Sequence, residues 1–314
     1  MEIGAVVPTA KLFGGVKRFL ELGNACIAKG HGFTLFTPDG RGPSWYDYEG
    51  NVDSIDAATA GPLDGLFITE TRFLDILVRS AARVKGFYYV MRRVDLSAVR
   101  AHPEITVFTN SSDLYEHACR KYRITPVRAF GAVDCDFYRP AAGGAREREG
   151  PVRVLAYGRL SRKRKGTRFV VRACERLYRG GYDLELILFD TPPDREARRL
   201  AADFSCKVPH EFLLDIPYSA NPSIYHRADI FVSAEKDAGW CNTCAEAMAC
   251  GLPVIATASG TSDFLRDGET GLRVRRNSWS VARGLRKLMA SPAMCHEFGR
   301  RGRERIEAFG WDRL

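Results

Sequence analysis

Short apolar runs alternate with segments of helical periodicity along most of the chain. The runs are continuously apolar rather than alternating, which is typical of parallel strands that are covered on both faces. The pattern predicts strands at 3–7, 33–37, 65–69, 87–91 and 105–109, and a second series at 152–158, 184–189, 229–234 and 253–258.

Amphipathic segments at 16–30 and 167–181 fill two of the intervals between these runs, and each ends in glycine, as a helix C-terminus often does. Alternation of strands and helices favours doubly wound parallel sheets. The segment AAGGAREREG at 141–150 interrupts the alternation with glycine, alanine and charge. It predicts a linker between two domains, which is the number that a chain of 314 residues usually forms.

The predicted architecture is therefore α/β, with two Rossmann-like parallel-sheet domains that face a central cleft. The N-terminal domain would span 1–140, the linker 141–150, and the C-terminal domain 151–314. In such sheets ligands bind at the carboxyl ends of the strands.

Composition narrows the class of protein. The chain is 45% hydrophobic and 27% charged, as globular proteins are, and no apolar run reaches the roughly 18–20 residues that a membrane-spanning helix needs. Met1 and Glu2 lead into an apolar stretch without a basic leader or a cleavage site, so the expected location is the cytoplasm. Nine cysteines, an odd number, then favour free thiols over a disulfide framework.

Charge is distributed unevenly. Residues 1–140 hold 17 Lys and Arg against 16 Asp and Glu, a net of +1, which leaves 47 − 17 = 30 against 38 − 16 = 22, a net of +8, for the remainder. A basic second half suggests a polyanionic ligand such as nucleotide phosphates, an anionic membrane surface or nucleic acid. Ordinary solvated surface charge is the alternative.

Two glycine-containing turns follow predicted strands. Gly14 and Gly15 stand where the first helix begins, and free amides there favour an anion, although paired glycines also form ordinary turns. After 152–158, Arg159 leaves the strand and Lys165 precedes Gly166 at the approach to the next helix. Two cations at a strand's carboxyl end suit a diphosphate, whereas the intervening 162–164 favours a solvated basic loop.

The stretch AGWCNTCAEAMACGLPVIA at 238–256 carries a single carboxylate among small and apolar residues. Backbone amides at the start of its helix could bind phosphate oxygens, and Glu246 could accept hydrogen bonds from a ribose diol. A carboxylate that only interacts with the helix dipole is the alternative, but a buried charge needs a partner. The predicted donor-binding residues here are Trp240, Cys241, Asn242, Thr243 and Glu246.

Two short motifs raise the question of a metal. Cys241 and Cys244 have zinc-like spacing, but no second pair follows to complete four ligands. Asp134 and Asp136 form a DxD, which could hold a divalent cation against a diphosphate, yet the motif is frequent by chance. No metal site is predicted.

The second half resembles the family-four retaining glycosyltransferases, which have the GT-B fold. The resemblance runs in order through YGRLSRKRKGT, YHRADIFVSAE, AEAMACGLPVIAT and DGETGLRV, and more loosely through FGGVKRFLELGNACIAKGH and GAVDCDFYRP, which looks like the entry into the second domain. It implies metal-independent transfer of a sugar from a nucleotide-diphosphate sugar, without any cofactor, to a glycan or lipid-linked acceptor, with retained configuration.

The same resemblance assigns roles to residues. Arg159 and Lys165 would neutralise the leaving diphosphate, and Glu246 would hold the ribose. The amides near Cys241, Asn242 and Thr243 would cradle the phosphates, with the turn at Gly15 facing them across the cleft.

This chain departs from the family pattern at several positions. Ala238 stands where the family has a glutamate, with Glu235 and Asp237 nearby as substitutes, and Phe189 to Thr191 replace a glycine-rich strand end. The histidine that many members carry after the strand at 87–91 is absent, and the chain stops at 309–314, where relatives continue into a helix that packs back on the first domain. These departures keep open a second class, a non-catalytic nucleotide-sugar-binding protein or partner subunit.

The basic segments raise two further kinds of partner, an anionic membrane surface and nucleic acid. The basic segments 281–290 and 295–309 are compatible with peripheral contact to an anionic membrane surface, and solvent-facing helix surface is the alternative. Nucleic acid is not predicted as a partner, because the RKRK run lacks an aromatic-interleaved strand or a reader helix.

Overall fold

The computed structural model describes residues 1–142 and 150–313, and they divide into two compact units, Met1–Ala132 and Val133–Arg313. Most of the predicted linker, 143–149, lies outside the described residues. Residues 133–140 belong with the second unit rather than the first. The amide of Val133 donates to the carbonyl of Phe309 (3.1 Å), and the Arg303 guanidinium donates to the carbonyls of Cys135 and Tyr138.

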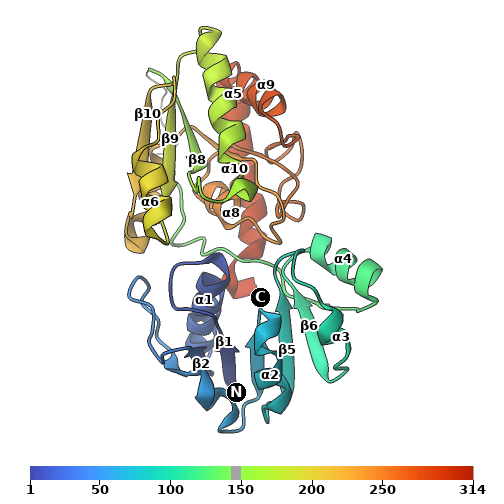
Figure 1. Ribbon diagram of the computed structural model, residues 1–314. Coiled ribbons are helices and arrows are strands. Elements are labelled where there is room, and N and C mark those ends of the chain that lie inside the picture. Colours follow the sequence, from blue (N-terminus) through green and yellow to red (C-terminus); the bar gives the residue numbers. More distant parts are fainter. Residues whose placement is uncertain (143–149, 314) are drawn as a thin grey trace. The chain divides into compact units, whose positions relative to one another are not determined.

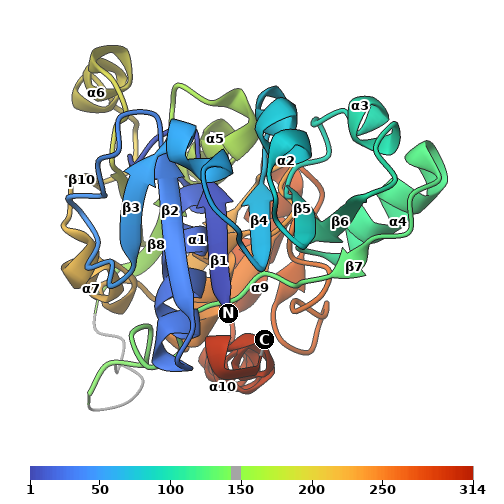
Figure 2. The same cartoon turned by 90° about the horizontal axis from the view of Figure 1, so that it is seen from below.

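The first unit is a seven-stranded parallel sheet in the order β3-β2-β1-β4-β5-β6-β7, which can be followed in Figure 2. Its strands are β1 Glu2–Val6, β2 Gly32–Thr37, β3 Asn51–Ser54, β4 Gly65–Ile68, β5 Val84–Tyr89, β6 Ile105–Thr109 and β7 Val127–Arg128. Its α-helices are α1 Gly14–Ala28, α2 Leu74–Arg79, α3 Ser97–Arg100 and α4 Ser112–Tyr122, with 3-10 turns at Ile55–Thr59 and Thr71–Phe73.

Both faces of this sheet are buried. Val6 and Tyr89 belong to the hydrophobic cluster on one face, whereas Ala5, Val7 and Tyr88 belong to the cluster that packs against α1 on the other. Neighbouring residues of one strand point to opposite faces, so every position must be apolar. This explains why the runs in the sequence are continuous rather than alternating.

The second unit is a six-stranded parallel sheet in the order β10-β9-β8-β11-β12-β13. Its strands are β8 Val152–Tyr157, β9 Leu184–Asp190, β10 His210–Leu214, β11 Ile230–Ser233, β12 Val254–Ala256 and β13 Leu272–Arg273. Its α-helices are α5 Thr167–Arg179, α6 Arg195–Ala202, α7 Asn221–His226, α8 Asn242–Ala249, α9 Ser278–Met289 and α10 Pro292–Ile306, and 3-10 turns lie at Lys163–Lys165, Tyr218–Ala220, Glu307–Phe309 and Trp311–Arg313 (Figure 1).

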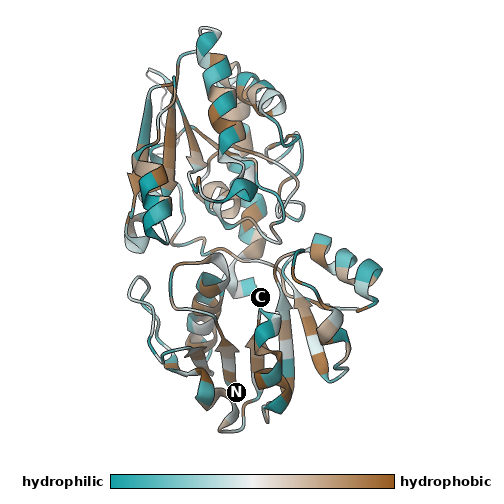
Figure 3. Ribbon diagram, viewed as in Figure 1, coloured by the Kyte–Doolittle hydropathy of each residue, from teal (hydrophilic) through white to brown (hydrophobic). Residues whose placement is uncertain are grey.

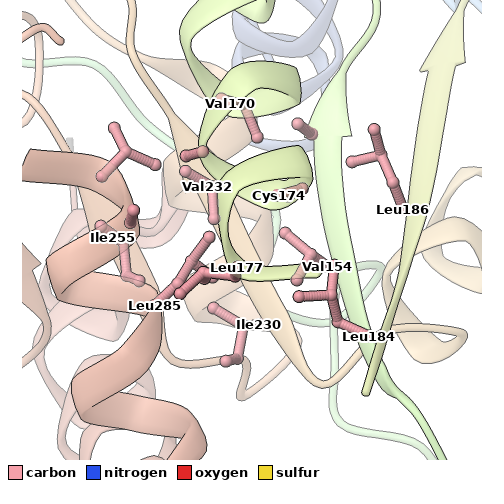
Figure 4. Packing of buried hydrophobic residues seen from close by; sticks show 14 of the residues in the cluster. Val154, Val170, Cys174, Leu177, Leu184, Leu186, Ile230, Val232, Ile255 and Leu285 are labelled. Atoms are coloured by element: carbon pink, nitrogen blue, oxygen red, sulfur yellow. The ribbon is translucent and has the colours of Figure 1, made fainter. Parts of the chain in front are cut away.

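Helix α5 shows how the pattern of the sequence becomes packing. Val170, Ala173, Cys174 and Leu177 recur at the spacing of one helix face, and all four are buried. They meet Val154 and Val232 of the sheet, together with Leu285 of α9, in the core of the second unit (Figure 4). The opposite face of α5 is rich in arginine, and the contrast is visible as alternating brown and teal in Figure 3.

In the described part of the chain, no helix is both long and apolar enough to span a bilayer.

Candidate functional site

Charged residues gather at the carboxyl ends of three adjacent strands of the second sheet. Arg159 follows β8, Asp190 ends β9, and Glu235 follows β11. Because β8 pairs with β9 on one side and β11 on the other, the segments that leave these strands meet at one edge. This edge is where doubly wound sheets bind ligands.

Arg159 is fixed by a buried carboxylate. Its Nε lies 2.8 Å from both Oδ1 and Oδ2 of Asp190, and its Nη2 donates to the carbonyl of Thr191 at 2.8 Å. Arg159 is only 7% exposed and Asp190 only 4%. Burial raises the pKa of the Asp190 carboxyl, and the charge of Arg159 opposes that rise. The guanidinium is therefore held in one orientation by these hydrogen bonds.

Lys165 is held by a second buried carboxylate. Its Nζ lies 2.7 Å from Oε1 of Glu235, and the Nη1 of Arg164 lies 3.4 Å from the same oxygen. Glu235 is 4% exposed. The two cations predicted from sequence lie beside the same aromatic ring, because the Lys165 Nζ and the Arg159 Cζ lie 5.3 Å and 5.5 Å from the centre of the Tyr157 ring.

The position of Lys165 depends on the glycine that follows it. Gly166 has a φ of +77°, which favours glycine, and a Cβ at this position would lie 2.0 Å from the carbonyl oxygen of Ala234. The loop that carries Lys165 can therefore touch the end of β11 directly. Since Glu235 is the residue after Ala234, this close approach brings the lysine to its partner.

The start of α8 lies beside this pair, because the Cys241 Sγ is 3.9 Å from Oε2 of Glu235. The Cys241 carbonyl accepts hydrogen bonds from the amides of Cys244 and Ala245, so the amides of Asn242 and Thr243 come before the first intrahelical donor and have no acceptor within the helix. The Cys241 amide itself donates to the carbonyl of Gly260 at 2.8 Å. The phosphate cradle stays a prediction, and its candidate donors are the amides of Asn242 and Thr243, because the Cys241 amide already fixes the turn.

Trp240 turns its side chain into the protein interior. It is 8% exposed, and its ring lies 4.7 Å from the ring centre of Phe264 and 5.3 Å from that of Phe309. In this structure the indole packs within an aromatic cluster, so contact of its ring with a donor would require rearrangement.

The two motifs with metal-like spacing have structural roles. The Sγ atoms of Cys241 and Cys244 lie 3.3 Å apart, and this hydrogen bond lowers the pKa of the Cys241 thiol. Among residues 1–142 and 150–313, no cluster of three or more His, Cys, Asp or Glu side chains is arranged to hold a metal ion. In the DxD motif, Oδ1 of Asp134 accepts hydrogen bonds from the amides of Asp136 and Phe137 and thereby closes a turn.

Glu246 lies within α8, is 5% exposed, and has a partner that the sequence did not reveal. The Tyr225 hydroxyl, from α7, donates to its Oε2 at 2.5 Å. Burial raises the pKa of Tyr225 well above its usual value, so the tyrosine keeps its proton and remains a donor. The Tyr225 ring also contacts Phe189, the residue before Asp190, which places Glu246 at the same edge of the sheet as the two cations.

Gly14 and Gly15 lie in the first unit, as the exposed first residues of α1. The Lys17 amide already bonds the carbonyl of Phe13 at 2.9 Å. A Cβ at Gly15 would meet no heavy atom within 4 Å, so the protein's own packing does not require glycine there. The approach to the first amides of this 15-residue helix is therefore open, and anion binding at this turn stays a prediction.

Comparison with known proteins shows which family and which characterised proteins this chain is similar to. Residues 143–305 match the family model described as "Glycosyl transferases group 1". The chain is 29% identical over 269 residues to the alpha-maltose-1-phosphate synthase of Mycolicibacterium smegmatis, covering 74% of this chain and 65% of that protein. It is 27% identical over 158 residues to the capsular polysaccharide biosynthesis glycosyltransferase CapM of Staphylococcus aureus, covering 49% and 41%. The chain thus spans less than two thirds of these curated relatives.

Solved structures show the fold. Sucrose-phosphate synthase from Thermosynechococcus elongatus has a TM-score of 0.81 and 19% identity, covering 99% of this chain and 95% of that one. Anabaena HepE in complex with UDP and glucose has a TM-score of 0.73 and 13% identity, with coverage of 99% and 95%. The prediction of a GT-B protein with two Rossmann-like parallel sheets is confirmed.

Proposed function

Since the chain belongs to the glycosyl transferases group 1 family, we propose that it transfers a sugar from a nucleotide-diphosphate sugar to an acceptor, with retained configuration and without a metal ion. One observation carries this proposal. Arg159 and Lys165, each held by a buried carboxylate, lie beside one tyrosine ring at the carboxyl edge of the second sheet, next to the start of α8.

This arrangement suits the departure of a nucleoside diphosphate. Cleavage of the sugar–phosphate bond places negative charge on the leaving group, and fixed cations and amides stabilise that charge without reorganising. Arg159 supplies a planar donor whose orientation Asp190 fixes, and Lys165 supplies a point charge. The amides of Asn242 and Thr243 add two neutral donors from a helix start.

We assign the ribose to Glu246, with Tyr225 as the residue that orients its carboxylate. A carboxylate can accept several hydrogen bonds, so a tyrosine hydroxyl on Oε2 is compatible with a ribose hydroxyl at the same group. HepE was solved with UDP and glucose, and a nucleoside diphosphate of that kind is the ligand we propose here. We propose a glycan or lipid-linked alcohol as the acceptor.

Replacement of Glu246 by alanine is expected to weaken nucleoside-diphosphate affinity by about 1–3 kcal/mol, the scale of hydrogen bonds to a charged group. Isothermal titration calorimetry with the nucleotide measures this change. Tyr225→Phe is the matched control, since it removes the orienting hydroxyl but leaves the carboxylate, and should lose less affinity. If Glu246→Ala folds normally and binds nucleotide like the unaltered protein, the assignment of the ribose to Glu246 is wrong.

A non-catalytic nucleotide-sugar-binding protein is the second candidate function. Ala238 stands where relatives carry a glutamate, and its amide donates to the Ser259 hydroxyl at 2.9 Å, so the segment is firmly placed without an acid at that position. Glu235 supplies an acid three residues earlier, but its carboxylate is engaged by Lys165.

Two measurements separate these candidates. A thermal-shift screen of nucleoside-diphosphate sugars identifies the donor without knowledge of the acceptor. The best donor is then incubated with the protein alone, and release of free nucleoside diphosphate is followed. Slow release supports the transferase, whereas binding without release, for every donor and across a panel of glycan and lipid-linked acceptors, supports the binding protein.

A further inference from the structure

Helices α5 and α9 lie side by side on the second sheet (Figure 1). Each buries one face against the core, with Leu177 of α5 and Leu285 of α9 in the same cluster (Figure 4). Their outer faces remain exposed to solvent, and neither belongs to the donor site described above.

These outer faces are basic. Helix α9 carries no acidic residue, and α5 carries only Glu175, whose Oε1 accepts a hydrogen bond from the Lys207 amide. All the cations of the two helices are exposed or half-exposed. We call them the basic face: Arg168, Arg172, Arg176 and Arg179 of α5, and Arg283, Arg286 and Lys287 of α9.

An aromatic residue stands within the basic face. Trp279, in the first turn of α9, is 67% exposed, and the Arg176 guanidinium lies 3.3 Å from its ring centre. Tyr178, at the end of α5, is 41% exposed. An indole that stays mostly in water is available to a surface that would bury it, and its burial would then stabilise the contact.

Helix α10 is also rich in arginine, but three of its arginines have acidic partners. The Arg300 guanidinium lies 2.9 Å from Glu297, Arg301 lies 2.5 Å from the same carboxylate, and Arg303 lies 2.6 Å from Glu307. These three arginines therefore pair with acids of the same helix or of the 3-10 turn that follows it. Of the two segments predicted to suit membrane contact, 281–290 contains no acidic residue, whereas three arginines of 295–309 are paired with glutamates.

We propose that the basic face is a docking surface for an anionic lipid bilayer. Lys and Arg near such a surface are attracted to its phosphate headgroups, and an exposed indole favours the interface between headgroups and acyl chains. The contact between Arg176 of α5 and Trp279 of α9 joins the exposed faces of the two adjacent helices, as contact with an extended surface requires. Binding of RNA or DNA to the same cations is the outcome that the test below distinguishes from binding to a bilayer.

Vesicle co-sedimentation of the full chain tests the proposal. The protein should bind vesicles that contain phosphatidylglycerol, should not bind phosphatidylcholine alone, and should be released by salt. Arg283→Glu combined with Lys287→Glu should weaken binding by about tenfold or more. The control is Lys29→Glu combined with Arg100→Glu, which changes the net charge equally at exposed positions of the first unit and should bind like the unaltered protein.

Trp279 gives a second readout. Its fluorescence should shift to the blue on addition of the anionic vesicles, and Trp279→Phe should lose that shift while still folding. Equal vesicle binding by the two double variants would overturn the proposal, as would tighter binding to a random RNA that is lost with the same α9 substitutions. These assays contain no sugar donor, so their outcome is independent of the transferase activity.

Discussion

Lys165→Ala should lower the rate of donor turnover by about 10²–10³-fold, the usual cost of removing one group that stabilises charge in the transition state. Affinity for the ground-state donor should fall much less, because the charge that Lys165 meets develops as the diphosphate leaves. Nucleotide release under single-turnover conditions measures the first quantity, and calorimetric titration with the nucleoside diphosphate measures the second.

Lys163 provides the matched control for this result. It lies in the same 3-10 turn, its side chain is exposed, and its backbone carbonyl accepts a hydrogen bond from Arg276. Lys163→Ala should turn over the donor at the unaltered rate, because the substitution keeps that carbonyl. Loss of rate and affinity in equal measure for Lys165→Ala would show instead that the lysine contributes only uniform binding of donor and transition state.

Arg159→Ala is expected to cost about 3–5 kcal/mol of unfolding free energy, because it leaves the Asp190 carboxylate buried without its cation. The two side chains are 9% and 2% exposed, so solvent screens the pair little. Urea unfolding followed by circular dichroism measures the loss. A loss of unfolding free energy below about 1 kcal/mol is typical of exposed ion pairs and would contradict the buried position of Arg159 and Asp190.

The pH dependence of this variant follows from the same burial. Burial already raises the pKa of Asp190, and the variant loses the positive charge of Arg159 that opposes this rise. A carboxyl with a higher pKa in the folded state stabilises the fold below its unfolded pKa, and that stability is lost as pH rises through the folded pKa. Arg159→Ala should therefore lose more stability at about pH 8 than at about pH 5, relative to the unaltered protein.

A double substitution separates stability from catalysis at this pair. Arg159→Met with Asp190→Leu replaces a buried ion pair by apolar side chains of similar size, which is often neutral or stabilising. The double variant should regain the unfolding free energy that Arg159→Ala loses, yet it should not regain donor turnover. Recovery of turnover would mean that Arg159 acts only as a structural residue.

The sequence predicted the interior of both sheets but not their edges. All nine predicted strands are present, and the four that were missed, β3, β7, β10 and β13, are the outermost strands of their sheets. An edge strand pairs on one side only and is less fully covered, so residues such as Val127 and Arg128 of β7 remain exposed. Hydrophobic periodicity finds strands through burial, and these four strands lack most of that signal.

For the site, the sequence supplied the cations and the helix start but not the groups that hold them. Asp190 and Glu235 each end an apolar strand run, and a charged residue in that place was the available signal for a buried partner. Tyr225 left no such signal, since an aromatic residue in a helix usually means packing. Its pairing with Glu246 depends on how α7 and α8 lie together, which no local pattern encodes.

Gly166 shows how the chemistry of this edge depends on a residue that would touch no ligand. Any side chain there would collide with the Ala234 carbonyl and push the loop outward, so Lys165 would lose Glu235 even though both residues were unchanged. Gly166→Ala should therefore reduce donor turnover much as Lys165→Ala does. A mutational scan that measures activity should find substitutions of Gly166 as poorly tolerated as those of the charged residues around it.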